Sequence, residues 1–204
     1  MNDNNAEYFD IGLVVPLEEE LLHVMEQFPS VEDRSTDTVF CHVVDSGKPD
    51  IRMIVVQQQG MGKTHAMNAA NFLLERVDLG LVMCLGIAGS LSDDMRLGSV
   101  CYSGKIADVL DNNKVTDLEH DDSDTEFSPT HYDTPDKFTQ AFGYIRTQPQ
   151  LRPAYLEWQA QRKAVAEELV TAEVPAPGGN MERIAEPRTL NGIIVCGMVS
   201  KSES

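Results

Sequence analysis

The sequence predicts an α/β fold in which a mixed central sheet is flanked by helices on both faces. Short apolar runs rich in β-branched residues recur along the first half of the chain. Segments with apolar residues at helical spacing alternate with these runs, and such alternation is typical of α/β proteins. With 204 residues, the chain is long enough for one sizeable core, so we expect a single domain over residues 1–204.

The first strand and helix are predicted near the N-terminus. Ile11–Val15 is a continuous apolar run, which favours a strand. The residues after it place apolar side chains at helical spacing: Leu17, Leu21, Leu22, Met25 and Phe28. A hairpin is expected next, because Thr38–Asp45 and Ile51–Gln58 flank the turn signal Ser46–Pro49.

The middle of the chain continues the alternation. Residues 62–77 contain good helix formers, and Ala66, Ala69 and Ala70 on one side favour close packing against a sheet. Leu79–Gly89 is too apolar for a one-sided strand, so we expect a central strand covered on both faces. Leu97–Gly104 predicts another strand.

The second half is less regular. We expect an acidic loop at 111–133, in which Thr116–Phe127 carries six acidic residues but lacks the ligand spacing and turn glycine of a calcium loop. Amphipathic helices are predicted at 135–147 and 154–170. A connector rich in Pro and Gly spans 171–191, and 192–199 predicts a last buried strand.

Composition narrows the class of partner. The 33 acidic and 16 basic residues give a net charge of −17, which disfavours nucleic acid and leaves small molecules open. The N-terminus lacks the features of a signal peptide, and no apolar run approaches about 18 residues, so we expect a cytoplasmic protein without a membrane span. The four cysteines are Cys41, Cys84, Cys101 and Cys196, and they lack Cys-x-x-Cys pairing. We interpret them as reduced thiols, three of which lie within predicted buried strands.

The segment Gln57–Ala66, QQQGMGKTHA, raises the question of a phosphate-binding loop. Such a loop needs Gly-x-x-x-x-Gly-Lys-[Ser/Thr], because its first glycine lets backbone N–H groups surround the phosphates. Gln57 occupies the position of that glycine, so a nucleoside triphosphate hydrolase is disfavoured. Lys63 is instead interpreted as a solvated residue at a helix start.

Three ordered segments, Ile11–Leu22, Val55–Arg76 and Leu81–Val100, resemble the purine nucleoside phosphorylase and methylthioadenosine/S-adenosylhomocysteine nucleosidase superfamily. The resemblance implies a nucleoside phosphorylase-like three-layer sandwich. It also implies that Gly60 and Gly62 form a strand-to-helix junction, with backbone turns that most side chains forbid.

The resemblance also implies a site. Nucleosidases of this superfamily use water as the nucleophile, held by the last glutamate of a triplet, and Glu20 stands in that place. The alternative for Glu18, Glu19 and Glu20 is an acidic first helical turn that complements the helix dipole. The implied substrate-binding residues are Pro16, Gly86, Ile87, Ala88, Gly89, Gly197 and Met198, and no metal or cofactor is expected.

Departures from the family pattern refine these expectations. Cys84 stands where phosphorylases place an arginine for phosphate, which favours hydrolysis because a thiol cannot supply a cationic fork. Met198 replaces an acid, and the chain ends before the family's ribose-binding Met-Glu and proton-donating Ser-Asp.

We therefore expect this chain to be the N-terminal two thirds of the family domain and to be nearly inactive alone. We also expect it to expose apolar surface that favours a homo-oligomer. The alternative function is a degenerate nucleoside-binding sensor or assembly module.

Overall fold

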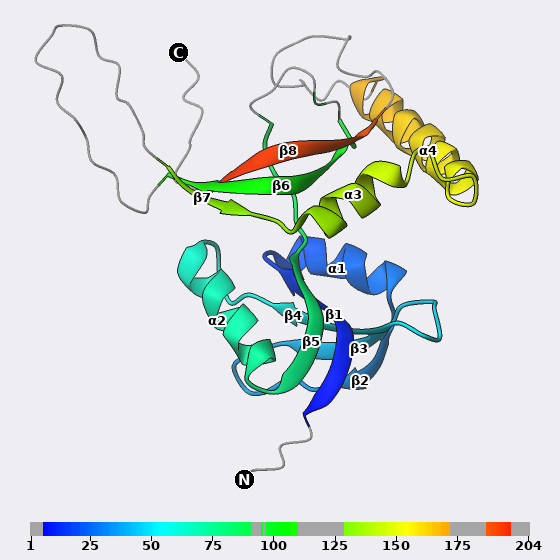
Figure 1. Ribbon diagram of the computed structural model, residues 1–204. Coiled ribbons are helices and arrows are strands. Elements are labelled where there is room, and N and C mark those ends of the chain that lie inside the picture. The colour runs from blue at the N-terminus through cyan, green and yellow to red at the C-terminus, as the bar shows by residue number, and fades with distance from the viewer. Residues whose placement is uncertain (1–5, 91–94, 96, 110–128, 172–186, 197–204) are drawn as a thin grey trace, which may run out of the picture. The chain divides into compact units, whose positions relative to one another are not determined.

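The computed structural model describes residues 6–90, 95, 97–109, 129–171 and 187–196. Contacts divide the chain into two compact units, Met1–Gly89 and Ser90–Ser204, each with its own sheet and helices. Figure 1 shows strands and helices alternating along the first unit. The α/β fold class with a mixed sheet is confirmed, whereas the single domain stays a prediction.

The first unit is built on a five-stranded mixed sheet of order β2-β3-β4-β1-β5. The strands β4, β1 and β5 run parallel to one another, and β3 pairs antiparallel with both β2 and β4. The predicted hairpin is therefore confirmed as β3–β4. The bounds are β1 Glu7–Val15, β2 Ser30–Asp33, β3 Cys41–Asp45, β4 Arg52–Gln57 and β5 Val77–Cys84.

Helices α1 (Glu18–Gln27) and α2 (Lys63–Leu74) cover opposite faces of this sheet, as predicted (Figure 1). Successive side chains of a strand point to opposite faces. One face packs around Leu21 and Val24 of α1, and its strand residues are Leu13, Val15, Val44, Met53 and Val55. The other packs around Ala69 and Leu73 of α2, and its strand residues include Val14, Cys41, Val43, Ile54 and Val56.

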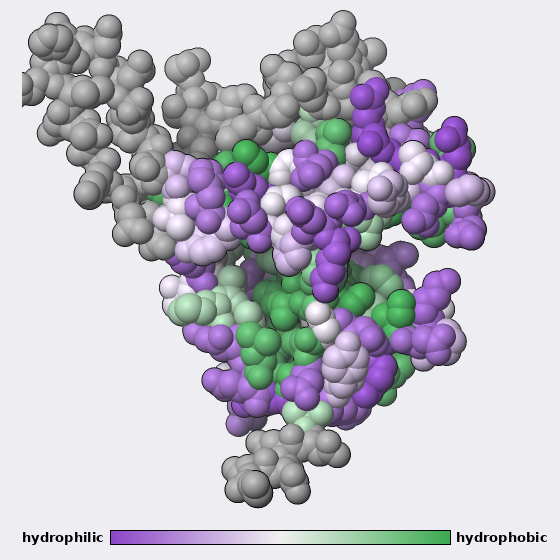
Figure 2. Space-filling model, in the orientation of Figure 1, coloured by the Kyte–Doolittle hydropathy of each residue, from purple (hydrophilic) through white to green (hydrophobic). Residues whose placement is uncertain are grey.

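The placement of β5 corrects the prediction for Leu79–Gly89. The strand ends at Cys84 and lies at the edge of the described sheet, where its only strand neighbour is β1. Alternate residues of β5 are exposed, so the part of the chain that the structure describes does not cover both of its faces. Figure 2 shows apolar side chains gathered on the face of this unit where β5 lies.

The cysteines also differ from their prediction as core thiols. Only Cys41 is buried, and there desolvation raises the pKa of its thiol to about 11. Cys84 and Cys196 are exposed and Cys101 is half-buried, because β5, β6 and β8 are only partly covered among the described residues.

The second unit contains a three-stranded sheet of order β7-β6-β8, with β6 parallel to β8 and antiparallel to β7. Both predicted helices are confirmed, and α3 packs on β6 and β8. The last strand is confirmed, but its predicted burial is wrong, since most of its residues are exposed. The bounds are β6 Val100–Asp108, β7 Thr130–Asp133, α3 Asp136–Tyr144, α4 Arg152–Thr171 and β8 Thr189–Cys196.

Two predicted loops extend beyond the described residues. Within the expected acidic loop, residues 130–133 form β7, and 110–128 lie outside the described residues. Residues 189–191 of the expected connector belong to β8, and 172–186 lie outside the described residues.

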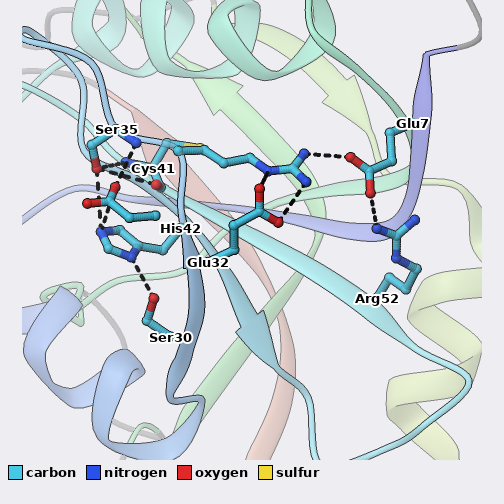
Figure 3. A network of polar contacts seen from close by, with 9 residues as sticks. Glu7, Ser30, Glu32, Ser35, Cys41, His42 and Arg52 are labelled. Atoms are coloured by element: carbon cyan, nitrogen blue, oxygen red, sulfur yellow. Dashed lines mark hydrogen bonds and ion pairs between the residues drawn. The ribbon is translucent and has the colours of Figure 1, made fainter.

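A polar cluster surrounds the start of β1 (Figure 3). Glu7 accepts hydrogen bonds from Arg34 and Arg52, and Arg34 also forms a two-pronged pair with Glu32 at 2.8 and 2.9 Å. Both guanidinium carbons lie over the buried Phe9 ring, at 5.3 and 4.4 Å from its centroid. Hydrogen bonds from Arg34, and then from Arg52, hold the pKa of Glu7 below its ordinary value.

We expect Glu7→Gln to lower stability at neutral pH by no more than about 1 kcal/mol, because the pairs are partly exposed. A carboxylate whose pKa is lower in the folded state than in the unfolded state stabilises the protein at pH values above the unfolded-state pKa. That contribution is lost as the pH falls through the folded pKa. Urea unfolding should therefore show the difference from wild type shrinking in acid and in high salt.

Asp37→Asn is the matched control, because it also removes an exposed carboxylate and no ion pair to Asp37 is recorded among the described residues. A Glu7→Gln effect that stays constant between neutral and acidic pH would contradict the ion-pair interpretation.

Candidate functional site

The candidate site lies where the parallel strands of the first unit end. The Leu85 N–H, just beyond β5, donates to the Val14 carbonyl at 3.0 Å. The Gln58 N–H, just beyond β4, donates to the Val15 carbonyl at 3.0 Å. These bonds hold the segments that leave β4 and β5 on either side of the β1–α1 turn. Open α/β sheets bind ligands at this edge.

Glu20 occupies the centre of this edge and is only 6% exposed. Its Oε2 accepts a 2.9 Å hydrogen bond from the Leu17 N–H, because a glutamate in the third helical position can reach back to the residue that precedes the helix. Its Oε1 accepts a 2.5 Å bond from the Ile87 N–H, which is contributed by the segment after β5. The carboxylate thus joins α1 to the end of β5.

The other two glutamates of the triplet behave differently. Glu18 and Glu19 are exposed in the first turn of α1, where a negative charge complements the helix dipole. The dipole explanation is sufficient for these two residues. It does not account for the burial of Glu20 or for its bond to a segment 67 residues away.

Gly86 makes room for the Glu20 carboxylate. A Cβ atom at this position would lie 2.9 Å from Oε1 and 3.1 Å from Oε2. Contacts this short require one group to move, and Glu20 is held by two N–H donors. The glycine is therefore needed for close approach, and neither a sharp turn nor a positive φ explains it.

The segment after Gly86 is open. Ile87 directs its N–H to Glu20, while its side chain is 80% exposed. Ala88 and Gly89 are also exposed, and a Cβ at Gly89 would meet no atom within 4 Å. Pro16 is half-buried between β1 and α1. These predicted residues therefore lie along one edge, with backbone and an apolar side chain facing open space.

The geometry defines what Glu20 can do chemically. Each carboxylate oxygen can accept two hydrogen bonds. In Glu20, each oxygen accepts one hydrogen bond from a backbone N–H. Each oxygen can therefore accept one further hydrogen bond, from a water or from a ligand hydroxyl. Because both bonds come from backbone, the acceptor is fixed before any ligand arrives.

The prediction for Gly60 and Gly62, at the strand-to-helix junction beyond β4, is confirmed in part. Gly62 has a φ of +103° and immediately precedes α2, so it uses the freedom of glycine. Gly60 is not among the positive-φ glycines, and a Cβ there would instead approach the His65 ring at 3.1 Å. Lys63 is exposed at the start of α2, as predicted.

Gln58 is a residue that sequence reasoning missed. It is 6% exposed, and its Oε1 is buried without a hydrogen-bond partner among the described residues. The available signal was a glutamine two positions after Met53–Val56, the four buried residues of β4. The remaining predicted residues, Gly197 and Met198, lie outside the described residues.

Within the described ranges, no group of three or more His, Cys, Asp or Glu side chains is arranged to hold a metal ion. None of the described helices combines the length and apolar character that a membrane span requires.

The chain matches known proteins over most of its length. The family model described as the phosphorylase superfamily matches residues 10–199. A 5′-methylthioadenosine/S-adenosylhomocysteine nucleosidase from Shewanella pealeana is 27% identical over 96 residues, which are 47% of this chain and 40% of that protein. The matched part is thus less than half of this relative's length.

Solved structures show the same fold. The nucleosidase of the same name from Neisseria meningitidis, in complex with methylthio-immucillin-A, has a TM-score of 0.55 at 16% identity. That match covers 91% of this chain and 63% of the other. The corresponding enzyme from Colwellia psychrerythraea, in complex with adenine, has a TM-score of 0.58 at 15% identity, covering 95% and 64%.

Proposed function

Because the chain belongs to the phosphorylase superfamily, we propose that its protein hydrolyses the N-glycosidic bond of a purine nucleoside or thioadenosine derivative. The observation that carries this proposal is the buried Glu20 carboxylate, held by the N–H groups of Leu17 and Ile87. The nucleosidase relatives and the shared fold support the same reaction class.

In the proposed reaction Glu20 accepts a hydrogen bond from water and orients its oxygen toward the anomeric carbon of the sugar. The bond from that carbon to the base nitrogen breaks, its electron pair leaves with the base, and a C–O bond to water forms. Glu20 takes the proton that the water loses, and the departing base takes up a proton from solvent. Positive charge develops on the sugar, which a nearby carboxylate stabilises.

The proposed binding residues flank this carboxylate. Pro16 and the Gly86–Gly89 segment would contact the nucleoside, because they lie along the sheet edge that carries Glu20. The Ile87 side chain supplies exposed apolar surface next to it. Gly197 and Met198 remain proposed substrate contacts on the basis of the family resemblance alone.

The distribution of arginines supports hydrolysis over phosphorolysis. Arg34 and Arg52 pair with Glu7 at the start of β1, at the opposite end of the strand from Glu20. Arg76 lies over the Phe72 ring after α2. The three arginines described in this unit are therefore engaged elsewhere, and Cys84 occupies the end of β5.

The test is base release from methylthioadenosine by the full-length protein, followed chromatographically in phosphate-free and in phosphate-containing buffer. We expect release of adenine at equal rates in both buffers, with a free sugar as the second product. A rate that depends on phosphate, with a sugar phosphate as product, would show phosphorolysis instead. Binding of the nucleoside without release would replace the enzyme proposal with the nucleoside-binding alternative.

We also propose that the protein forms a homo-oligomer. Exposed apolar side chains on and just beyond β5 support this proposal, since Val82 is 38% and Leu85 40% exposed at the edge of the described sheet. Sedimentation equilibrium tests it, and a monomer at all concentrations would contradict it.

A further inference from the structure

We propose that two copies of this chain pair through the outward face of α2, with the two helices antiparallel across a two-fold axis. This inference rests on the proposed homo-oligomer, because it takes a second copy as the partner. It does not depend on the reaction assigned to Glu20. The outward face consists of the exposed residues of α2 and its C-cap: Lys63, Thr64, Met67, Asn68, Asn71, Leu74 and Glu75.

The first argument is the apolar content of this face. Ala69 and Leu73 are the buried residues of α2, so at 3.6 residues per turn the helix side opposite to them is centred on Asn71. Met67 and Leu74 lie one turn on either side of Asn71, and they are 55% and 58% exposed. Large apolar side chains that share one exposed stripe are typical of an interaction surface, unlike apolar residues scattered singly.

The second argument is charge, which identifies the partner. Two copies that each carry a net charge of −17 repel one another unless they meet through a surface of balanced charge. The outward face carries only two charged residues, Lys63 at its start and Glu75 at its end. A two-fold axis across the helix reverses its direction, so Lys63 of each copy meets Glu75 of the other. The face is therefore complementary to itself.

The charged ends also set the register of the pair. If Lys63 lies opposite Glu75, the two-fold axis passes at the level of position 69, midway between them. Met67 and Asn71 of both copies then lie beside the axis, and Leu74 lies against Thr64 of the other copy. The antiparallel arrangement also places the positive end of each helix dipole beside the negative end of the other.

The third argument is continuity with the apolar edge at β5. Val82 lies opposite Gly12 in the ladder between β5 and β1. A Cβ at Gly12 would lie 3.2 Å from Cδ1 of Leu73, which belongs to α2, so Val82 points to the α2 side of the sheet. A helix of 12 residues is only about 18 Å long. Since stable interfaces bury about 800 Å² per partner, the exposed edge beside α2 would supply the rest of the contact.

The first experiment measures the dimer dissociation constant of the full-length protein by sedimentation equilibrium, for wild type, Leu74→Glu and Leu22→Glu. Leu22 is the matched control, because it is 59% exposed on α1, which covers the opposite face of the sheet. We expect Leu74→Glu to raise the dissociation constant about a hundredfold or more, since a two-fold interface contains each substitution twice. Leu22→Glu should leave it unchanged, and thermal unfolding verifies that both variants are folded.

Charge reversal tests the antiparallel register. Lys63→Glu and Glu75→Lys should each raise the dissociation constant about tenfold at low salt, and less at high salt. The double variant Lys63→Glu/Glu75→Lys should return to within about threefold of wild type, because the opposite charges meet again. The two positions are about 18 Å apart along one helix, so this rescue must come from contact between copies. The single variants change the net charge in opposite directions, so general repulsion cannot explain a loss in both.

The outcomes separate this inference from the proposals on which it builds. If wild type dimerises and Leu74→Glu dimerises equally well, or if Leu22→Glu weakens the dimer as much, the role of α2 is wrong and the homo-oligomer proposal stands. A double charge variant that pairs no better than the single variants would also overturn the antiparallel arrangement. A monomeric wild type would overturn both the inference and the homo-oligomer proposal, whereas base release tests the reaction separately.

Discussion

Glu20→Gln is expected to lower kcat for base release by about 10²- to 10⁴-fold, the range in which a positioned proton-accepting group contributes. The amide has nearly the shape of the carboxylate but cannot take a proton from water. It also has one oxygen where two N–H groups converge, so its NH₂ group must face the Leu17 or the Ile87 N–H. We expect the local arrangement to lose about 1–3 kcal/mol for that reason.

The measurement is kcat for adenine release, with circular dichroism and thermal unfolding to verify that the variant is folded. Glu19→Gln is the matched control, because it makes the same charge change in the same helical turn at an exposed residue. It should retain wild-type kcat. Full activity in Glu20→Gln, or an equal loss in Glu19→Gln, would show that the buried carboxylate has no catalytic role.

Local elements of the first unit could be predicted from sequence because their signals are local. Apolar runs marked β1 and β4, helical spacing marked α1, and the turn signal at Ser46–Pro49 marked the β3–β4 hairpin. The position of β5 was predicted wrongly, because an apolar run does not reveal how many strands flank it. Its length in residues was also overestimated, since Leu85–Gly89 is apolar or small but lies beyond the strand.

The candidate site was only partly predictable, for a related reason. The family pattern identified Glu20 and the segment at Gly86, but the sequence alone allowed a simple helix-dipole role for the glutamate. Their contact joins residues far apart in the chain, so only the fold shows that the glycine leaves space for the carboxylate. Gln58 was missed because whether an amide is paired depends on its three-dimensional surroundings.

Gly86→Ala is expected to disturb the site through one methyl group. The added Cβ would lie 2.9 Å from Glu20 Oε1 and 3.2 Å from its Cδ, so the carboxylate or the backbone must shift. Overpacking of this kind costs about 1–3 kcal/mol of unfolding free energy. A shifted Glu20 would also hold the attacking water less well, so we expect kcat to fall together with stability.

Unfolding in urea and kcat for base release measure the two effects. Gly89→Ala is the control for stability, because a Cβ there meets no atom within 4 Å and should leave the unfolding free energy unchanged. The double variant Gly86→Ala/Glu20→Gln tests the route of the catalytic effect. If Gly86 acts through the carboxylate, the double variant should lose no more activity than Glu20→Gln alone, because interacting residues are not additive. Losses that multiply would show that Gly86 contributes to catalysis independently of Glu20.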